Sequence, residues 1–195
     1  MEGSITTLLI LGAMAAVVLL FRVMIRRPRR ASQQDPPGVR TMAVFSGDDR
    51  EFFQDDPDGG MLVGIRLFQK LCDGLAAERI RVENRGTIQN AQRAECVVDE
   101  ERFALVLEWI DGVWAASVEW VPRTAAEKRH LALTQQVFAP SDGPALRRLL
   151  AALDRWLKAQ AKLTDLKWHH KEKWIAEDTS DPADEPFDSA AHDFS

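Results

Sequence analysis

Cysteine and histidine are scarce in this sequence of 195 residues, which contains two cysteines and four histidines. Cys72 and Cys96 both fall at apolar positions of the elements expected around them, so we expect buried, reduced thiols that pack as small hydrophobic side chains. His130 and His192 each stand alone in the sequence. Only His169 and His170 therefore remain as histidines that could share a site.

Several motifs that would announce an activity are also missing. The glycines near residue 60 lack the lysine spacing of a phosphate-binding loop, and no strand-to-helix glycine fingerprint occurs. No serine lies in a nucleophile elbow. The acidic residues between positions 48 and 58 lack the spacing and the closing glutamate of an EF-hand. We therefore expect no cofactor and no metal.

Charge excludes a further class of function. Residues 61–176 contain 18 lysines and arginines against 15 aspartates and glutamates, which is nearly balanced. A nucleic-acid-binding domain normally shows a marked basic excess. We therefore expect no nucleic-acid partner.

The beginning of the chain has what the rest lacks, a long uncharged apolar run. Residues 5–21 contain no charge, and five arginines follow within nine positions. This pattern predicts a single transmembrane helix over residues 5–25 that contacts the lipid bilayer. A cleaved signal peptide would carry its basic residues before the apolar run, so the anchor is favoured. Gly12 and Ala16 could let two such helices approach closely as a homodimer.

Charge near the helix predicts its orientation. Arginines beside a spanning helix stay on the cytoplasmic side, so the short N-terminus is expected outside the cell membrane and the C-terminal domain in the cytoplasm. Four of these arginines could also contact anionic lipid headgroups. They are Arg26, Arg27, Arg29 and Arg30.

Composition divides the remaining chain into three parts. Residues 26–60 are first basic and then acidic, with several prolines and glycines, and are predicted to form a flexible linker. Residues 61–176 are long enough for one domain with its own core. Residues 177–195 carry seven acids and no lysine or arginine, which predicts a disordered acidic tail.

One hairpin provides the clearest fold signal. Residues 103–110 and 113–121 are rich in β-formers and are separated by Asp111-Gly112, a dipeptide favoured in two-residue turns. That turn sets Trp109 opposite Trp114 and continues with apolar pairs on the same face as far as residues 103 and 120. The alternating pattern requires the same register.

Further strands are expected before this hairpin. With Glu100 and Glu101 as a loop, Val98 would face Phe103, and residues 94–98 would extend the apolar face. A short strand over residues 80–83 would precede it across a polar loop at residues 84–92.

Apolar residues at helical spacing predict two helices, over residues 61–78 and 146–161, with Pro144 suited to the first turn of the second. The expected fold class is α+β: after the transmembrane helix, a two-layer domain in which an antiparallel β-meander packs against two helices.

Two segments allow either a strand or a helix. Thr124 and Glu127 match a capping box and would begin a helix, but the apolar residues that follow alternate, which favours a strand over residues 130–138. Residues 166–175 alternate in the same way and suit a final edge strand, although they could prolong the preceding helix.

The segment after residue 167 gives the one candidate interaction surface: Trp168, His169, His170, Lys171 and Trp174. Aromatic residues in a basic segment are typical of protein contacts, so we expect a small cytoplasmic interaction domain that binds a protein partner of unknown identity. The alternative is a membrane-tethered, metal-dependent or histidine-based hydrolase, with His169 or His170 acting beside Asp165 or Glu172. Adjacent strand residues point to opposite faces, which argues against a shared metal ion.

Overall fold

The computed structural model describes residues 35–47, 53–55, 61–88, 91–134, 140–171, 174 and 182–188. All of them belong to one compact unit, Gln33–Ser195. The predicted anchor at residues 5–25 lies outside the described residues. Within the described part of the chain, no helix is both long and apolar enough to cross a membrane.

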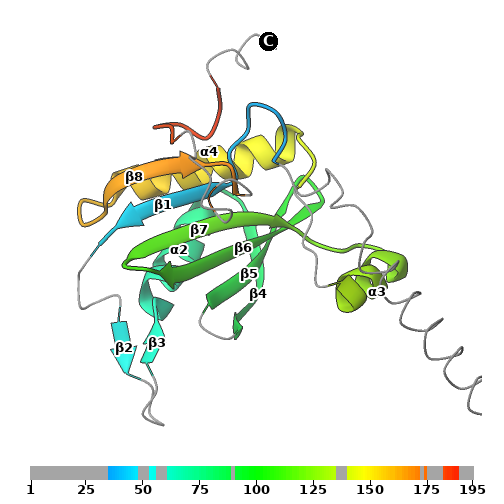
Figure 1. Cartoon of the computed structure of the whole chain (residues 1–195), viewed down its shortest axis with the longest axis horizontal. Coiled ribbons are helices and arrows are strands. Elements are labelled where there is room, and N and C mark those ends of the chain that lie inside the picture. Colours follow the sequence, from blue (N-terminus) through cyan, green and yellow to red (C-terminus); the bar gives the residue numbers. More distant parts are fainter. Residues whose placement is uncertain are drawn as a thin grey trace, which may run out of the picture. The chain divides into compact units, whose positions relative to one another are not determined.

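A six-stranded antiparallel sheet forms the centre of this unit (Figure 1). Its strands occur in the order β4-β5-β6-β7-β1-β8, so the four middle elements of the chain form the predicted meander and two distant strands complete it. The strands are β1 (Met42–Ser46), β4 (Arg81–Ile88), β5 (Ala91–Val98), β6 (Glu101–Ile110), β7 (Val113–Trp120) and β8 (Thr164–His169). Two three-residue strands, β2 (Phe53–Asp55) and β3 (Met61–Val63), pair separately.

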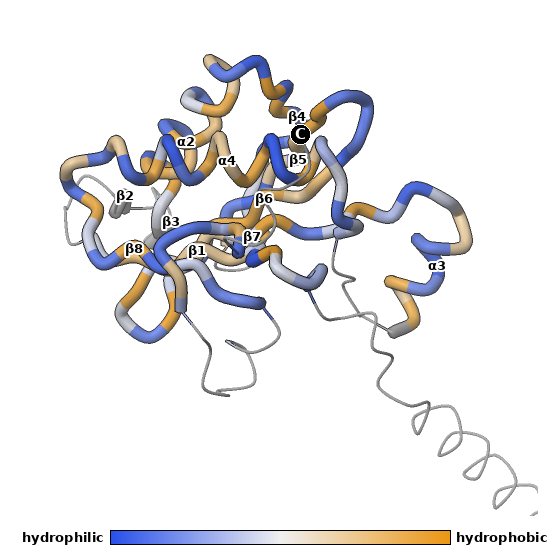
Figure 2. The backbone as a smooth tube through the Cα atoms, turned by 90° about the horizontal axis from the view of Figure 1, so that it is seen from above, coloured by the Kyte–Doolittle hydropathy of each residue, from blue (hydrophilic) through white to orange (hydrophobic). Residues whose placement is uncertain are grey.

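Two helices, α2 (Ile65–Ala77) and α4 (Pro144–Ala159), contact each other and the sheet (Figures 1 and 2). Each turns an apolar stripe towards the strands, because leucines recur at helical spacing in both. Pro144 lies in the first turn of α4, as predicted. The α+β class is therefore confirmed.

The first helix begins later than its sequence predicts. Met61–Val63 pairs with β2 as a strand, and Gly64 then adopts a left-handed conformation with φ of 78°. A Cβ atom on Gly64 would lie 2.5 Å from Cζ3 of Trp114, so only glycine lets the chain pass this close to the ring. The turn at Gly64 is what separates strand from helix.

The hairpin of β6 and β7 has the predicted register. Trp109 faces Trp114, and the pairing runs from Ile110 and Val113 outward to Phe103 and Trp120. The two central tryptophan rings meet edge to face, with centroids 4.9 Å apart. The turn and the apolar alternation both specify this pairing.

The hairpin of β5 and β6 is two residues out of the predicted register. Val98 pairs with Glu101 and Cys96 with Phe103, because Asp99 and Glu100 form the turn with φ angles of 47° and 66°. A shift of two residues leaves the same side chains on the core face, so the apolar pattern could not detect it.

Two expectations for the flanking segments are wrong. The segment predicted as a polar loop at residues 84–92 instead continues β4 to Ile88 and begins β5 at Ala91. Residues 130–134, predicted as strand, belong to helix α3 (Ala125–Thr134). The capping box decides this segment: the Glu127 backbone N–H donates to Thr124 Oγ1, and the Thr124 backbone N–H donates to Glu127 Oε2. The edge strand expected over residues 166–175 is confirmed only as far as His169, where β8 ends, because residues 171 and 174 are helical.

The predicted linker and tail also contribute to the domain. β1 lies within residues 26–60 yet pairs with both β7 and β8 in the sheet. Residues 182–188, predicted as part of a disordered tail, form bridges to Val39 and Trp168. Both corrections concern short segments whose partners lie far away in the sequence.

Candidate binding surface on the open face of the sheet

The two faces of the meander carry different side chains. In β6 and β7, the face towards α2 and α4 carries buried apolar residues such as Leu105, Leu107 and Val118. The opposite face, named the open face here, carries alternate residues of the same strands, including Glu108 and Glu119. The register that builds the core therefore also places these carboxylates together on the other side.

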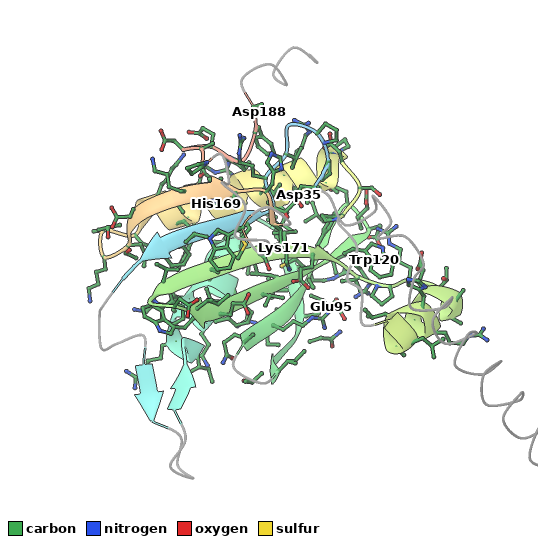
Figure 3. The ribbon with its side chains drawn as sticks, viewed as in Figure 1. Asp35, Glu95, Trp120, His169, Lys171 and Asp188 are labelled. Carbon is green, nitrogen blue, oxygen red and sulfur yellow. The ribbon has the colours of Figure 1, made fainter. Side chains whose placement is uncertain are left out.

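An open cavity of about 860 Å³ lies on the open face, bordered by β4 to β7, by residues 121–123 and by α3. Its lining combines charged residues of both signs with a few apolar ones. The charged side chains are Arg93, Glu95, Glu100, Arg102, Glu119, Arg123 and Lys128, and the apolar ones are Ile88, Trp120, Val121, Pro122 and Leu131. In Figure 3, Glu95 and Trp120 lie towards α3, whereas His169 and Asp188 lie towards β8.

Strand pairing gives this cavity its floor. Glu95 faces Ala104 across β5 and β6, and Ala104 faces Glu119 across β6 and β7. Ala104 is buried and small, so the two carboxylates stand on either side of a low point in the sheet. A larger residue at position 104 would fill this space.

Ion pairs hold part of the cavity wall. Arg102 Nη1 lies 2.9 Å from Glu83 Oε2 and 3.2 Å from Glu95 Oε2, and these carboxylates raise the pKa of Arg102, with the hydrogen bond to Glu83 the larger cause. Arg93 and Lys128, by contrast, have no ion pair with another residue in the described part of the chain. They are free to meet an acceptor on a ligand.

Two exposed apolar side chains lie on elements that border the same cavity, and one of them, Ile88, is part of its lining. Ile88, on β4, is 54% exposed, and Leu133, on α3, is 86% exposed; these are the large hydrophobic residues most open to solvent in the described ranges. α3 turns most of its surface to water and carries no buried stripe like those of α2 and α4. α3 therefore borders the cavity on one side of the open face.

A buried polar cluster borders the open face on the β8 side. Asp35 accepts hydrogen bonds from Thr41 Oγ1 at 2.7 Å, from the Thr41 backbone N–H at 3.0 Å and from the Lys171 backbone N–H at 3.1 Å. Lys171 Nζ reaches Ser117 Oγ at 3.4 Å and forms an ion pair with Glu119. These contacts join the segment before β1 to the segment after β8.

The residues predicted as an interaction surface differ in burial and do not form one exposed surface. Trp168 is fully buried in the core, and its Nε1 donates to Asp154 Oδ1 at 2.8 Å, so it offers no surface to a partner. His169 is 8% exposed, and burial, together with the nearby charge of Arg40, lowers its pKa. Trp174 is half-buried.

His170 and Lys171 lie beside the polar cluster. His170 Nδ1 is 3.8 Å from Asp35 Oδ2.

Of the partners that the hydrolase hypothesis requires, Asp165 is exposed on β8, and Glu172 lies outside the described residues. Among the side chains that the structure describes, no three of histidine, cysteine, aspartate and glutamate are grouped so as to hold a metal ion.

The cysteines are buried, as expected. Burial raises the pKa of Cys72 to about 11 and that of Cys96 to about 12. Both thiols are therefore protonated at neutral pH and poor nucleophiles.

Sequence reasoning identified only part of the open face. Alternation placed Glu108 and Glu119 opposite the apolar face, but nothing local showed that Arg93, Arg102 and Lys128 would line one cavity with Glu119. Comparisons of the chain with protein-family models, with curated proteins and with solved structures find no match.

Proposed function

We propose that this chain is a membrane-tethered domain that binds another protein through the open face of its sheet. The observation that carries the proposal is the exposure of Ile88, which lines the cavity, together with that of Leu133 on α3, a helix that borders the same cavity. Exposed apolar residues around a polar, arginine-containing depression are typical of protein interfaces.

The composition of the cavity supports the same proposal. Tryptophan and arginine are enriched among the residues that contribute most to protein binding, and Trp120 lies with Arg93 and Arg102 in the lining. Arg93 and Lys128 would pair with carboxylates of the partner, while Glu100 would meet a cation. A partner with mixed charges and an apolar centre fits this lining best.

The uncharged apolar run of residues 5–21 supports the membrane tether, and the arginines that follow support a cytoplasmic location of the domain. The same arginines would contact anionic headgroups at the membrane surface. Alkaline carbonate extraction of the full chain, compared with a chain that starts at residue 33, tests the tether. The full chain should stay in the membrane pellet and the shortened one should not.

Site-specific photo-crosslinking tests the binding surface. A photoreactive amino acid at position 88 or 133 should yield the same crosslinked partner in cells. The matched control is position 69 on α2, because Gln69 is also exposed to solvent but lies on the helical layer. Equal crosslinking from position 69, or none from positions 88 and 133, would contradict the proposal.

Charge insertion gives a second readout. Leu133→Asp should abolish crosslinking from position 88 without altering the fold, since the Leu133 side chain contributes almost nothing to the core. Gln69→Asp serves as the control and should leave crosslinking unchanged.

A further inference from the structure

Residues 182–188, named the strap here, are bound by the main chain at two points. The Trp168 N–H donates to the Ala183 carbonyl at 2.7 Å, and the Ala183 N–H donates to the Trp168 carbonyl at 3.0 Å. At the other end, the Arg40 N–H donates to the Pro186 carbonyl at 2.8 Å, and the Asp188 N–H donates to the Gly38 carbonyl at 3.0 Å. The strap therefore adds a short, strand-like segment to edge strand β8.

The side chains of the strap meet cations from separate elements. Lys167 Nζ, on β8, lies 2.6 Å from Asp184 Oδ1, and Lys158 Nζ, on α4, lies 2.7 Å from Glu185 Oε1. The hydrogen bond from Lys167 lowers the pKa of Asp184. Each of the two acids thus pairs with a lysine, and Lys158 also pairs with Asp154 at 2.9 Å.

The second half of the strap is held in a similar way. Arg40 Nη1 lies 2.5 Å from Asp188 Oδ1. The guanidinium carbon of Arg147 lies 5.2 Å from the centre of the Phe187 ring, which packs against the hydrophobic core, and Pro186 is buried. Each residue from 183 to 188 therefore contacts the surface below it.

This surface has the features of a peptide-binding groove. Peptides that add to a sheet edge gain affinity from main-chain hydrogen bonds and specificity from pockets for alternate side chains. Here the main-chain bonds come from β8 and residues 38–40, and the specificity comes from Arg40, Arg147, Lys158 and Lys167. The opposite edge strand, β4, carries no such cover in the described part of the chain.

We propose that this groove is a binding site for acidic segments of partner proteins that follow the pattern Ala-Asp-Glu-Pro-Phe-Asp, and that residues 183–188 occupy it within the same chain. Two ion pairs of the strap, Lys167–Asp184 and Lys158–Glu185, are exposed and contribute little, so the strap is held by its main-chain bonds, by the part-buried Arg40–Asp188 pair, by Phe187 and by its covalent connection. A connected segment binds with an effective concentration in the millimolar range. A partner segment therefore displaces the strap only when it binds this surface tightly enough to overcome that effective concentration.

The occupant is another protein rather than a second copy of the chain. Only seven residues join Trp174 to Pro182, so the strap returns to its own groove at low cost in loop entropy. If two copies of the chain exchanged their straps, each strap would make the same contacts as before, so the exchange would gain no binding energy. The inference goes beyond the proposed function, uses a surface other than the open face, and can fail without affecting that proposal.

The test measures binding of a fluorescein-labelled peptide, with the sequence of residues 181–189, to the full chain in lipid nanodiscs. The double variant Ala183→Pro/Phe187→Ala opens the strap, because it removes the N–H that bonds to Trp168 and the ring that packs on the core. The matched control is Phe194→Ala, which removes the other phenylalanine of the same tail. The opened variant should bind the peptide at least about tenfold more tightly than the wild type or the control.

A second opening variant guards against loss of the fold. Asp184→Lys/Glu185→Lys repels the lysines of the groove but leaves the core contacts of Phe187 in place, and it should also raise peptide affinity. Near-ultraviolet circular dichroism of the Trp109 and Trp114 pair reports that the domain remains folded.

Charge exchange tests the specificity. In the Ala183→Pro/Phe187→Ala background, Lys167→Glu should weaken binding of the acidic peptide about fivefold and restore binding of a peptide with lysine in place of Asp184. Three results would overturn the proposal: opened and folded variants that bind no better than the wild type, affinity that ignores Lys167→Glu, or light scattering that shows tight dimers formed by exchange of the strap.

Discussion

Replacing Gly64 with alanine tests how firmly the start of α2 is fixed against the sheet. A left-handed backbone costs a residue with a side chain about 1–2 kcal/mol, and Gly64 has φ of 78°. The added methyl group would also lie 2.5 Å from Cζ3 and 2.8 Å from Cη2 of Trp114. Overpacking of this kind costs about 1–3 kcal/mol, so we expect a total loss of about 2–5 kcal/mol.

The steric part of this estimate depends on whether the Trp114 ring can move. The ring is fully buried, its Nε1 donates to the Gly47 carbonyl at 3.1 Å, and it packs edge to face on Trp109. Each contact opposes the displacement that a methyl group at position 64 requires. We therefore expect the chain, and not the ring, to shift.

Three other glycines separate the two causes. Gly112 has φ of 92° and open space around its Cα, so Gly112→Ala should cost only the conformational part, about 1 kcal/mol. Gly86 has open space and no left-handed backbone, so Gly86→Ala should be neutral or stabilise by about 0.5 kcal/mol. In Gly74→Ala, a clash with Trp156 opposes a helix-propensity gain of about 1 kcal/mol.

Urea unfolding of residues 33–195, followed by tryptophan fluorescence, measures all four variants. For three of them the expected order of destabilisation is Gly64→Ala, then Gly112→Ala, then Gly86→Ala, and of these three only Gly64→Ala should change the near-ultraviolet spectrum. Gly74→Ala should change that spectrum through Trp156. If Gly64→Ala costs no more than Gly112→Ala, then the Trp114 ring yields and the steric argument is wrong.

Three further predictions concern buried polar and titratable groups. Asp154→Ala should cost about 2–3 kcal/mol in urea unfolding because it leaves the Trp168 indole N–H buried without its acceptor, whereas Asp154→Asn should cost less. Cys72 and Cys96 should resist thiol reagents at pH 8 until the protein unfolds. Because their pKa values are raised in the folded state, their contribution to the free energy of unfolding should be complete below pH 9 and decline as the pH rises towards 11–12. Variants with alanine in place of each cysteine should lack this decline. Because the pKa of His169 is lowered in the folded state, the unfolded chain takes up more protons near pH 6.5, so stability should fall below that pH in the wild type and less in His169→Gln.

Local sequence determined the hairpin of β6 and β7 because two independent signals agreed there. The Asp111-Gly112 turn and the apolar alternation both required Trp109 opposite Trp114. In the preceding hairpin the alternation alone remained, and it cannot distinguish registers that differ by two residues. The turn at Asp99 and Glu100 decided that register instead.

The missed segments share a physical cause. β1 is apolar but only five residues long, too short to stand out from the polar segment around it, and the strap contains acids and two prolines and has little apolar pattern of its own. Their stability comes from partners far along the chain, such as Trp168 for Ala183. Local composition does not report partners of this kind.

The open face could be predicted only in part for a related reason. Alternation indicates which strand residues point away from the core, but the neighbours across strands depend on the final register. α3 added a further difficulty, because Leu131 and Leu133 alternate like strand residues while the capping box at Thr124 and Glu127 is the stronger signal. A capping box satisfies backbone donors directly, which weak alternation does not.

The position of β1 between β7 and β8 imposes an order on folding. β4 to β7 are joined by short turns and can pair as each is synthesised, since local hairpins form quickly. Met42, by contrast, must wait for Ser117 on one side and His169 on the other. The N-terminal strand therefore remains unpaired through most of synthesis, and the sheet closes only when nearly the whole chain has left the ribosome.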